Sequence, residues 1–392
     1  MTDDAEILLA RMAAMVPDLR ARGRAAEQAG RIPDATIAEL DQAGAFRAVV
    51  PECYGGLELD FPVIPQILRI MGQGCVATAW TMGFLIYHNF QFAHFPEKAQ
   101  KEVWSGRGYT MAPGHIMPSG SAVPVDGGYR VSGQWGYATG ILHADWVLFS
   151  APVTGHGKNA TPDLRRFYVP VEDCEIVDGW DVSTMAATGS YDMALDDTFI
   201  PEYRQVKIAD VIAQTSPGLA INQGPLWRMP FISFTSLIAV APMIGGAEAM
   251  FALTSDILKT KVGAQSGIVQ QAAMAQQIRM ARIQMTIKSM LALWENALDF
   301  VWEKTVSGAP LTMEERAEAR VIAAHAAKIC DQAANELAVA AGSRGIFNDA
   351  PLQRFRREIN ALATHAFFDY DHLASLYGGT LLGADLPPHA MI

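Results

Sequence analysis

Two tryptophans, a tyrosine and a threonine lie among three glycines in the segment 131–146, VSGQWGYATGILHADW. Aromatic faces beside glycines let a flat ligand come close to the backbone, and the hydroxyl of Thr139 can hydrogen-bond a ring nitrogen. A hairpin with paired aromatic side chains in its core explains the same residues, because aromatic residues are common in strands. The segment is therefore a candidate site for a flat ligand, with a structural core as the alternative.

Nine histidines are the side chains best suited to act as acids or bases near neutral pH. His88 falls near a predicted helix end in YHNFQFAHF, His115 in the loop PGHIMPSG, and His365 in the predicted helix LATHAFFDYD. No pair has the spacing that places two metal ligands on one helix face, so we predict no metal site. A satisfied core histidine is the alternative for each of them.

Three arginines, Arg354, Arg356 and Arg357, follow Pro351 at the start of a predicted helix. Guanidinium groups bind phosphate or carboxylate well, and a solvated helix face is the alternative. The chain has no GxGxxG after a strand, no GxxxxGK[ST], no HExxH and no GxSxG. Dinucleotide, P-loop, zinc-protease and α/β-hydrolase sites are therefore unsupported.

The bulk composition limits the partners. Of the 392 residues 50% are hydrophobic and 18% charged, which suits a large core and argues against disorder. A net charge of −11 disfavours nucleic acid and anionic membranes. The four cysteines form no CxxC pair, and the N-terminal MTDDAEILLARM lacks a signal-peptide pattern. We expect a cytoplasmic protein, with the apolar stretch 231–251 as a buried core helix.

Helices are predicted at both ends of the chain. Apolar positions recur at three- and four-residue steps in 5–29, 35–43, 61–82 and 96–104. From residue 229 onward, a sequence rich in Ala, Met, Leu and Gln predicts long helices. Their expected ranges are about 231–262, 265–305, 312–341 and 351–377.

Short strands are predicted in between. Val, Tyr, Trp, Phe and Thr with Gly, Pro and Asp punctuation indicate strands at 129–135, 145–153, 166–171 and 191–199. Strands and helices are segregated, which excludes a doubly wound sheet. We expect a mostly α protein with a central β module. Its domains are an N-terminal helical domain (1–105), a central β domain (106–215) and a C-terminal helical bundle (216–392).

Landmark segments along nearly the whole chain together resemble the acyl-CoA dehydrogenase fold. They are AELDQAGAFRAVVPECYGG, GGYRVSGQWGYATGILHADW, DDTFIPEYR, AAGSRGIF and PLQRFRRE. The resemblance implies an N-terminal helical domain, a β-barrel-like middle domain, a C-terminal four-helix bundle and a homotetramer.

Within this superfamily the chain resembles the two-component flavin-dependent monooxygenases. These include the oxygenase component of p-hydroxyphenylacetate hydroxylase, dibenzothiophene monooxygenase, indole oxygenases and sugar N-oxygenases. Counting from Arg357, the place of the dehydrogenases' catalytic glutamate is Ala366, beside His365, and the monooxygenases carry a histidine there. The dehydrogenase-like TEPxAGSD segment is here APGHIMPSGSA, and LYGGTLL has Gly378 where the YEGT motif has glutamate.

The resemblance implies roles for individual residues. Thr139 matches the Ser or Thr that hydrogen-bonds flavin N5, and Lys259 lies where the family often has a phosphate-binding arginine. The residues expected to bind the flavin are Trp135, Tyr137, Thr139, Gly140, Lys259, Gly342, Ser343 and Arg344. Catalysis is expected from His365, Thr139 and His88, and substrate binding from His88 and His115.

The implied reaction uses reduced flavin, FADH2 or FMNH2, from a separate NAD(P)H-dependent flavin reductase, since the chain has no nicotinamide fingerprint. O2 would add at flavin C4a, and the resulting hydroperoxide would hydroxylate a small aromatic substrate of the phenol or indole type. Thr139 would hold flavin N5, an apolar pocket would slow proton leakage, and His365 would act as base or hydrogen-bond partner.

Two other functions stay open at this point. An acyl-CoA dehydrogenase would bind oxidised FAD tightly and take its base from an earlier helix. A non-catalytic helical ligand-binding scaffold would need none of the residues Thr139, His365 and Trp135.

Overall fold

The computed structural model describes residues 2–154, 163–387 and 390. They form two compact units, which are treated separately below. The sheet unit holds the described residues of Met1–Leu8, Ala29–Asp60 and Thr81–Phe231, and the bundle unit those of Leu9–Gln28, Phe61–Trp80 and Ile232–Ile392. Helices α1 (Asp3–Ala29) and α4 (Val76–Phe92) contribute residues to both units. The division into three domains at residues 105 and 215 remains a prediction.

One mixed sheet organises the sheet unit, with the described strands in the order β5-β6-β2-β1-β3-β4-β7. The strands are β1 (Ser121–Val125), β2 (Gly128–Ala138), β3 (Trp146–Val153), β4 (Asp163–Pro170), β5 (Glu175–Val177), β6 (Tyr191–Pro201) and β7 (Gln205–Lys207). Neighbours pair antiparallel, except that β1 and β3 are parallel. The strands expected at 129–135, 145–153, 166–171 and 191–199 are confirmed as β2, β3, β4 and β6.

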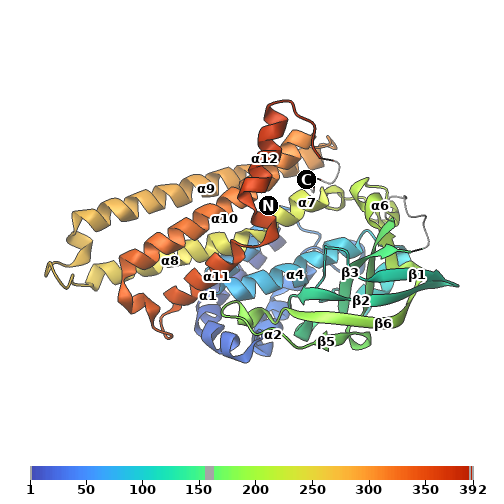
Figure 1. The fold of residues 1–392 in the computed structure, drawn as a ribbon, viewed down its shortest axis with the longest axis horizontal. Coiled ribbons are helices and arrows are strands. Elements are labelled where there is room, and N and C mark those ends of the chain that lie inside the picture. The colour runs from blue at the N-terminus through green and yellow to red at the C-terminus, as the bar shows by residue number, and fades with distance from the viewer. Residues whose placement is uncertain (1, 155–162, 388–389, 391–392) are drawn as a thin grey trace. The chain divides into compact units, whose positions relative to one another are not determined.

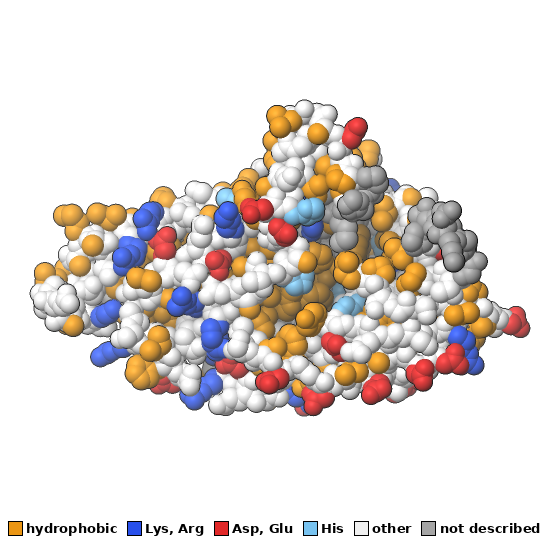
Figure 2. Space-filling view, viewed as in Figure 1, with side chains coloured by type: hydrophobic (Ala, Val, Ile, Leu, Met, Phe, Trp, Pro, Cys, Tyr) orange, Lys and Arg blue, Asp and Glu red, His pale blue; other side chains and the backbone are white. Residues whose placement is uncertain are grey.

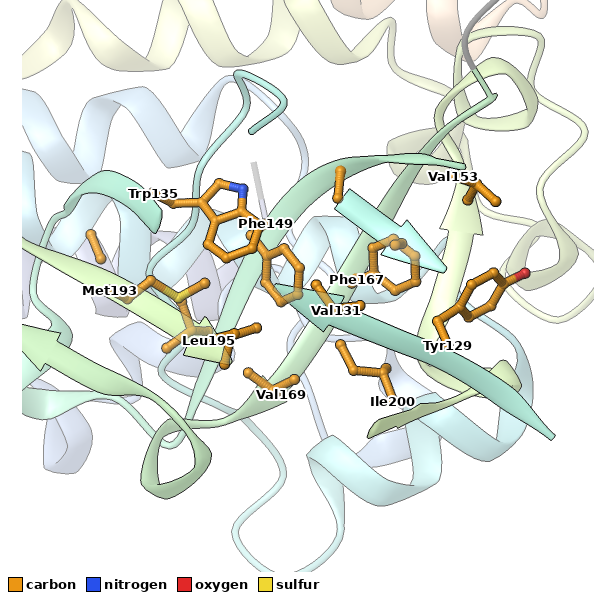
Figure 3. Close-up of a cluster of buried hydrophobic side chains, with 14 of the residues drawn as sticks. Tyr129, Val131, Trp135, Phe149, Val153, Phe167, Val169, Met193, Leu195 and Ile200 are labelled. Atoms are coloured by element: carbon orange, nitrogen blue, oxygen red, sulfur yellow. The ribbon is translucent and has the colours of Figure 1, made fainter. Parts of the chain in front are cut away.

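Alternating side chains of these strands form an apolar core (Figure 3). The rings of Trp135 and Phe149 lie 4.5 Å apart, and those of Phe149 and Phe167 stack at 5.7 Å. Such aromatic contacts bury large areas and fix the register of neighbouring strands. The unit also contains the helices α2 (Asp34–Ala43), α5 (Glu97–Trp104) and α6 (Ile208–Ile212).

Four helices form the bundle, with α8, α9 and α10 running lengthwise beside one another (Figure 1). They are α8 (Ala241–Thr260), α9 (Met274–Val306), α10 (Met313–Ala341) and α11 (Pro351–Leu362). Helix α3 (Val63–Gly72) packs against α8 so closely that a Cβ at Gly245 would lie 1.9 Å from the backbone oxygen of Arg69. Only glycine allows this approach of two backbones. Helix α10 begins at Thr312, whose hydroxyl forms a capping box with Glu315.

The prediction of one continuous helix over 351–377 is wrong. The structure divides it into α11, a 3-10 turn η11 (Ala366–Phe368) and α12 (Tyr370–Leu381). His365 and Asp369 interrupt it, because their side chains accept the free backbone N–H groups of the elements that follow. His365 therefore lies in a turn and not in a helix.

One described stretch, Phe231–Thr260, is long and apolar enough by composition to cross a membrane. It consists of α7 (Phe231–Ala239) and α8, and 78% of its most apolar window is buried inside the protein. Burial of this kind is typical of a core helix.

Candidate functional site

Thr139 directly follows β2 and starts a chain of three buried hydroxyl groups. Its Oγ1 lies 2.9 Å from Ser190 Oγ, which in turn lies 2.7 Å from Thr188 Oγ1. A hydroxyl has one donor and two acceptor positions, so Thr139 keeps hydrogen-bonding capacity for a ligand beyond its contact with Ser190. Sequence reasoning missed Ser190 and Thr188. Their signal was the Thr-Gly-Ser turn, in which Gly189 has a φ of +50°.

Gly140 brings this chain close to helix α4. Its φ is +84°, and a Cβ there would lie 2.9 Å from Thr81 Cγ2 and 3.4 Å from Leu85 Cδ1. Thr81, Leu85 and His88 follow each other at steps of four and three residues, so they lie on one face of α4. The face of α4 that lies next to Gly140 therefore also carries His88.

The two aromatic residues expected beside the flavin ring occupy different environments. Trp135 is buried in the core of the sheet, and its Nε1–H donates to the backbone oxygen of Ser150 (2.9 Å). This position fits an aromatic core pair better than a ligand-lining side chain. Tyr137 has a φ of +69° and is 69% exposed, with its ring against Trp180.

His88 is buried and has a defined tautomer. Its Nδ1 lies 2.6 Å from the backbone oxygen of Ala112, which can only accept, so Nδ1 carries the proton and Nε2 is the acceptor. Burial, aided by the positive charge of Arg166, lowers the pKa of His88 to about 3. At neutral pH, His88 is thus an uncharged hydrogen-bond acceptor, and its buried Nε2 has no hydrogen-bond partner among the residues that the structure describes.

His115 and Arg166 lie in the same part of the sheet unit. Arg166 is on β4, and its Nη1 donates to the backbone oxygen of His115 and to Ser150 Oγ. Burial, followed by the charge of Arg166, lowers the pKa of His115 to about 4. Sequence reasoning did not select Arg166, because alternation along a strand does not say which of two adjacent arginines points inward.

His365 belongs to the bundle unit, where aromatic rings surround it. The ring centroid of Trp80 lies 5.2 Å and that of Phe367 5.1 Å from its imidazole. Its Nδ1 accepts from the backbone N–H of Phe367 (3.2 Å), so the proton of the neutral ring is on Nε2. Burial, aided by the charge of Arg320, lowers the pKa of His365 to about 4. His365 is therefore an uncharged donor at neutral pH.

Two lysines near the end of α8 have different surroundings, and the role of Lys259 at the flavin phosphate remains a prediction. Lys259 is exposed and pairs with Asp256 one turn away on α8. Lys261, just beyond the helix, donates to the backbone oxygen of Ala341 (2.9 Å), and its Nζ lies 2.5 Å from where a Cβ of Gly342 would be. Lys261, and not Lys259, is the cation at the glycine-rich turn.

Two other residues of this turn have side chains that solvent, and so a ligand, can reach. Ser343 and Arg344, in η10 (Ser343–Ile346), are exposed.

The arginines after Pro351 form contacts inside the bundle unit. Arg357 pairs with Glu27 (2.7 Å), and Arg354 lies 3.8 Å from Glu358. Among the described residues, no group of three or more His, Cys, Asp or Glu side chains is placed to hold a metal ion.

These residues fit a flat, nitrogen-rich ring system. The buried hydroxyl of Thr139 has capacity to spare, and Gly140 leaves the backbone beside it uncovered by a side chain. Both histidines expected in chemistry are uncharged, one as acceptor and one as donor. Each environment by itself, that of His88 in the sheet unit and that of His365 in the bundle unit, suits proton transfer or hydrogen bonding in water-poor surroundings.

Comparison with protein families gives two matches. Residues 2–110 match the N-terminal domain of acyl-CoA dehydrogenase, and residues 237–370 match a C-terminal domain of acyl-CoA dehydrogenase.

Several characterised proteins are similar over nearly their whole length. The chain is 34% identical to a pigment production hydroxylase of Rhodococcus sp. (strain ATCC 21145), with 97% of each chain covered. It is 30% identical to the flavin-dependent monooxygenase oxygenase subunit HsaA of Mycobacterium tuberculosis, over 98% of this chain and 97% of that one. It is 28% identical to the oxygenase component of p-hydroxyphenylacetate 3-hydroxylase of Acinetobacter baumannii, over 97% and 90%.

Two solved structures have nearly the same fold as this chain. The crystal structure of the HsaA monooxygenase from M. tuberculosis superposes with a TM-score of 0.91 at 29% identity, covering 98% of both chains. XiaF from Streptomyces sp., in complex with FADH2 and glycerol, gives a TM-score of 0.90 at 27% identity, over 98% of this chain and 97% of that one.

Proposed function

From the premise that this chain belongs to the acyl-CoA dehydrogenase family and, within it, to the oxygenase components of flavin-dependent monooxygenases, we propose a substrate class and a role for each site residue. The expected fold, enzyme class and use of reduced flavin are confirmed by these similarities. The acyl-CoA dehydrogenase and the non-catalytic scaffold are set aside. As an oxygenase component, the protein depends on a separate flavin reductase, which we propose is NAD(P)H-dependent.

Reduced flavin, when bound, supplies the electrons that activate O2. We assign the hydroxyl of Thr139, oriented by Ser190, to the N5 edge of the ring, and the uncovered backbone of Gly140 to its face. Lys261, Gly342, Ser343 and Arg344 are assigned to the polar end of the flavin, with Lys261 replacing Lys259. FADH2 and FMNH2 differ in the length of the polar group that these residues would bind, and this length decides which of the two is preferred.

The substrate that fits best is a small phenol. The observation that carries this is the tautomer of His88: Ala112 fixes the proton on Nδ1, so the buried Nε2 accepts a hydrogen bond. A phenol O–H is a donor of matching kind, and a hydroxylation next to that oxygen gains from electron density pushed into the ring. Indole also offers a donor, its N–H, and is the second candidate.

Of the two roles expected for His365, base or hydrogen-bond partner, we propose the second. Its Nδ1 is occupied by the N–H of Phe367, which leaves Nε2–H as a donor. We assign it to donate a hydrogen bond to oxygen during the reaction, while His88 accepts the proton of the substrate. In this proposal His365 is the hydrogen-bond donor and His88 is the proton acceptor.

Reconstitution tests this proposal. The purified protein is mixed with a flavin reductase, NADH, FMN or FAD, and a panel of phenols, indole and thioethers under isotopically heavy O2. Incorporation of one heavy oxygen atom into a phenol, next to its hydroxyl, is the expected result. Labelled product from indole or a thioether but from none of the phenols would contradict the substrate assignment.

A second copy of this chain is the partner that we propose for helix α9, in a homotetramer. Its exposed apolar residues recur at steps of four, seven, eight and seven and so form one stripe. They are Met274, Ile278, Met285, Leu293 and Phe300, with exposed fractions of 73%, 62%, 55%, 41% and 37%. Figure 2 shows hydrophobic side chains at the surface along this edge of the bundle unit. An apolar stripe of this length is typical of a protein interface.

We also propose that the protein is cytoplasmic. All four cysteines, Cys53, Cys75, Cys174 and Cys330, are free thiols. Free thiols are the usual state in a reducing compartment.

A further inference from the structure

Arg166 is a buried cation that forms no ion pair within the described part of the chain. Its side chain is 6% exposed, and its Nε and Nη2 atoms are buried without a hydrogen-bond partner. Burial lowers its pKa to about 10, which still leaves it protonated at neutral pH. A buried charge without a partner is costly, so such an arginine indicates a ligand that carries the opposite charge.

The surrounding structure holds the guanidinium group in place. Its Nη1 is bound by the backbone oxygen of His115 and by Ser150 Oγ on the neighbouring strand β3. Gly114 makes room for it, because a Cβ there would lie 3.0 Å from Nη2. The side chain is thus fixed at one nitrogen and leaves its other two nitrogens, Nε and Nη2, available to donate.

Two buried histidine nitrogens near Arg166 also lack a hydrogen-bond partner within the described residues. They are the Nε2 atoms of His88 and His115. The charge of Arg166 acts on both imidazoles and lowers the pKa of each, which places all three side chains within electrostatic reach of one another. Tyr87 also interacts with Arg166, and Asp192 acts on His115 with the opposite sign. Arg166 thus brings a buried positive charge to this group of side chains, which suits an oxygen with negative charge.

We propose that Arg166 is the counter-ion of an ionised substrate oxygen, so that the enzyme binds its phenol as the phenolate. The inference deepens, and rests on, the phenol substrate proposed above. It adds a specificity-determining residue: the charge of Arg166 favours an acidic hydroxyl over an aniline N–H or a thioether of the same shape.

Proton balance is simple in this arrangement. The phenol O–H bond breaks, and its proton moves to Nε2 of His88, while the Nδ1–H of His88 stays on the backbone oxygen of Ala112. The oxygen keeps the electron pair and pairs with the guanidinium of Arg166. Without substrate, burial and then the charge of Arg166 disfavour a protonated His88. A phenolate offsets the charge of Arg166 and attracts the imidazolium, and both effects favour the proton on His88.

The test uses 4-nitrophenol, which is yellow only as the phenolate, with the full-length protein at a pH below the pKa of the probe in water. Wild-type protein should turn the bound probe yellow. Arg166→Met should abolish the colour and raise the dissociation constant about thirtyfold or more, and Arg166→Lys should keep the colour. Arg165→Met is the matched control. It lies next to Arg166 on β4 but pairs with Asp163 and Tyr129, and we expect no change in the colour.

A measurement on the wild type guards against variants that fail to fold. 4-Nitroanisole has the same ring but cannot ionise, and it should bind about thirtyfold more weakly than 4-nitrophenol. Equal affinities, or a colourless bound 4-nitrophenol, would overturn the role of Arg166. If phenols were still hydroxylated in that case, the proposed function would stand. If 4-nitrophenol bound as the phenolate but no phenol were hydroxylated, the proposed function would fail and the anion site would remain.

Discussion

The buried carboxylate of Glu358, on α11, accepts a hydrogen bond from the backbone N–H of Ala77 (3.1 Å) in the first turn of α4. Arg354, one turn earlier on α11, lies 3.8 Å from the same carboxylate. Helix α11 leads into the turn that carries His365, and this part of α4 carries Trp80, whose ring lies 5.2 Å from the imidazole. Glu358 therefore joins the two segments that meet at His365.

Removing this carboxylate should destabilise the protein strongly. Glu358→Ala removes the carboxylate that lies beside the buried guanidinium of Arg354 and accepts from the N–H of Ala77, and we expect a loss of about 3–5 kcal/mol in the free energy of unfolding. Chemical denaturation measures it. Glu358→Gln is the control, because its amide oxygen still accepts from Ala77. If both variants were equally unstable, the hydrogen bond would not be the cause.

The same residue predicts a dependence of stability on pH. Burial raises the pKa of Glu358 from 4.5 to about 7. Between these values the folded protein holds a proton that the unfolded chain has lost, so the contribution of Glu358 is full below pH 4.5 and falls as the pH rises through 7. Thermal melting of wild type and Glu358→Gln across this range should show the fall in the wild type alone. Parallel curves would contradict the assignment.

His94 predicts the opposite slope. Burial lowers its pKa from 6.5 to about 4, and its Nδ1 lies 2.8 Å from Ser216 Oγ. Its contribution to stability is present above pH 6.5 and is lost as the pH falls toward 4, because the unfolded chain takes up the proton first. His94→Gln should lose less stability than wild type on acidification. A pH curve of His94→Gln that runs parallel to the wild-type curve would contradict this assignment.

Thr139 should determine how well oxygen activation is coupled to product. Thr139→Ala removes the hydroxyl and leaves Ser190 without it, and one hydrogen bond of this kind corresponds to about a fivefold change. We expect the ratio of released H2O2 to hydroxylated product to rise about that much, as measured by peroxide assay and chromatography. Thr139→Ser keeps the hydroxyl and should stay coupled. An unchanged ratio in the alanine variant would exclude Thr139 from this role.

His365 should affect the yield of product more than the binding of flavin. In His365→Ala the donor at Nε2 is lost, and we expect the rate of hydroxylation to fall about a hundredfold. Reduced flavin should bind with nearly unchanged affinity, as judged by its fluorescence under anaerobic conditions. His372→Ala, on the exposed face of α12, is the control. A full product yield from His365→Ala would show that the reaction does not use this imidazole.

The sequence was sufficient for the pattern of elements and for the family. Alternating and three-to-four-residue periods predicted β2, β3, β4, β6 and the bundle helices, because burial of one face dictates those periods. Periodicity failed at 351–377, where the apolar spacing continues through a turn. Two side-chain caps, His365 at the start of η11 and Asp369 at the start of α12, mark the break there and leave little trace in composition.

The site was harder to predict because neighbours in sequence point in different directions. Lys259 and Lys261 are two residues apart, yet α8 ends between them, so one lies on the helix surface and the other reaches the turn at Gly342. Arg165 and Arg166 are adjacent, and the strand turns one toward Asp163 and the other into the interior. Such choices depend on packing partners from distant segments, which a single sequence does not show.

The three hydroxyls of Thr139, Ser190 and Thr188 have one further property. Each group can give or take a hydrogen, so rotating all three O–H bonds together reverses the direction of the whole chain without moving a heavy atom. In one direction Thr139 points its hydrogen outward, and in the other it presents a lone pair. The same arrangement of heavy atoms can thus hydrogen-bond a ring nitrogen both with and without its proton. Only the three O–H bonds need to rotate.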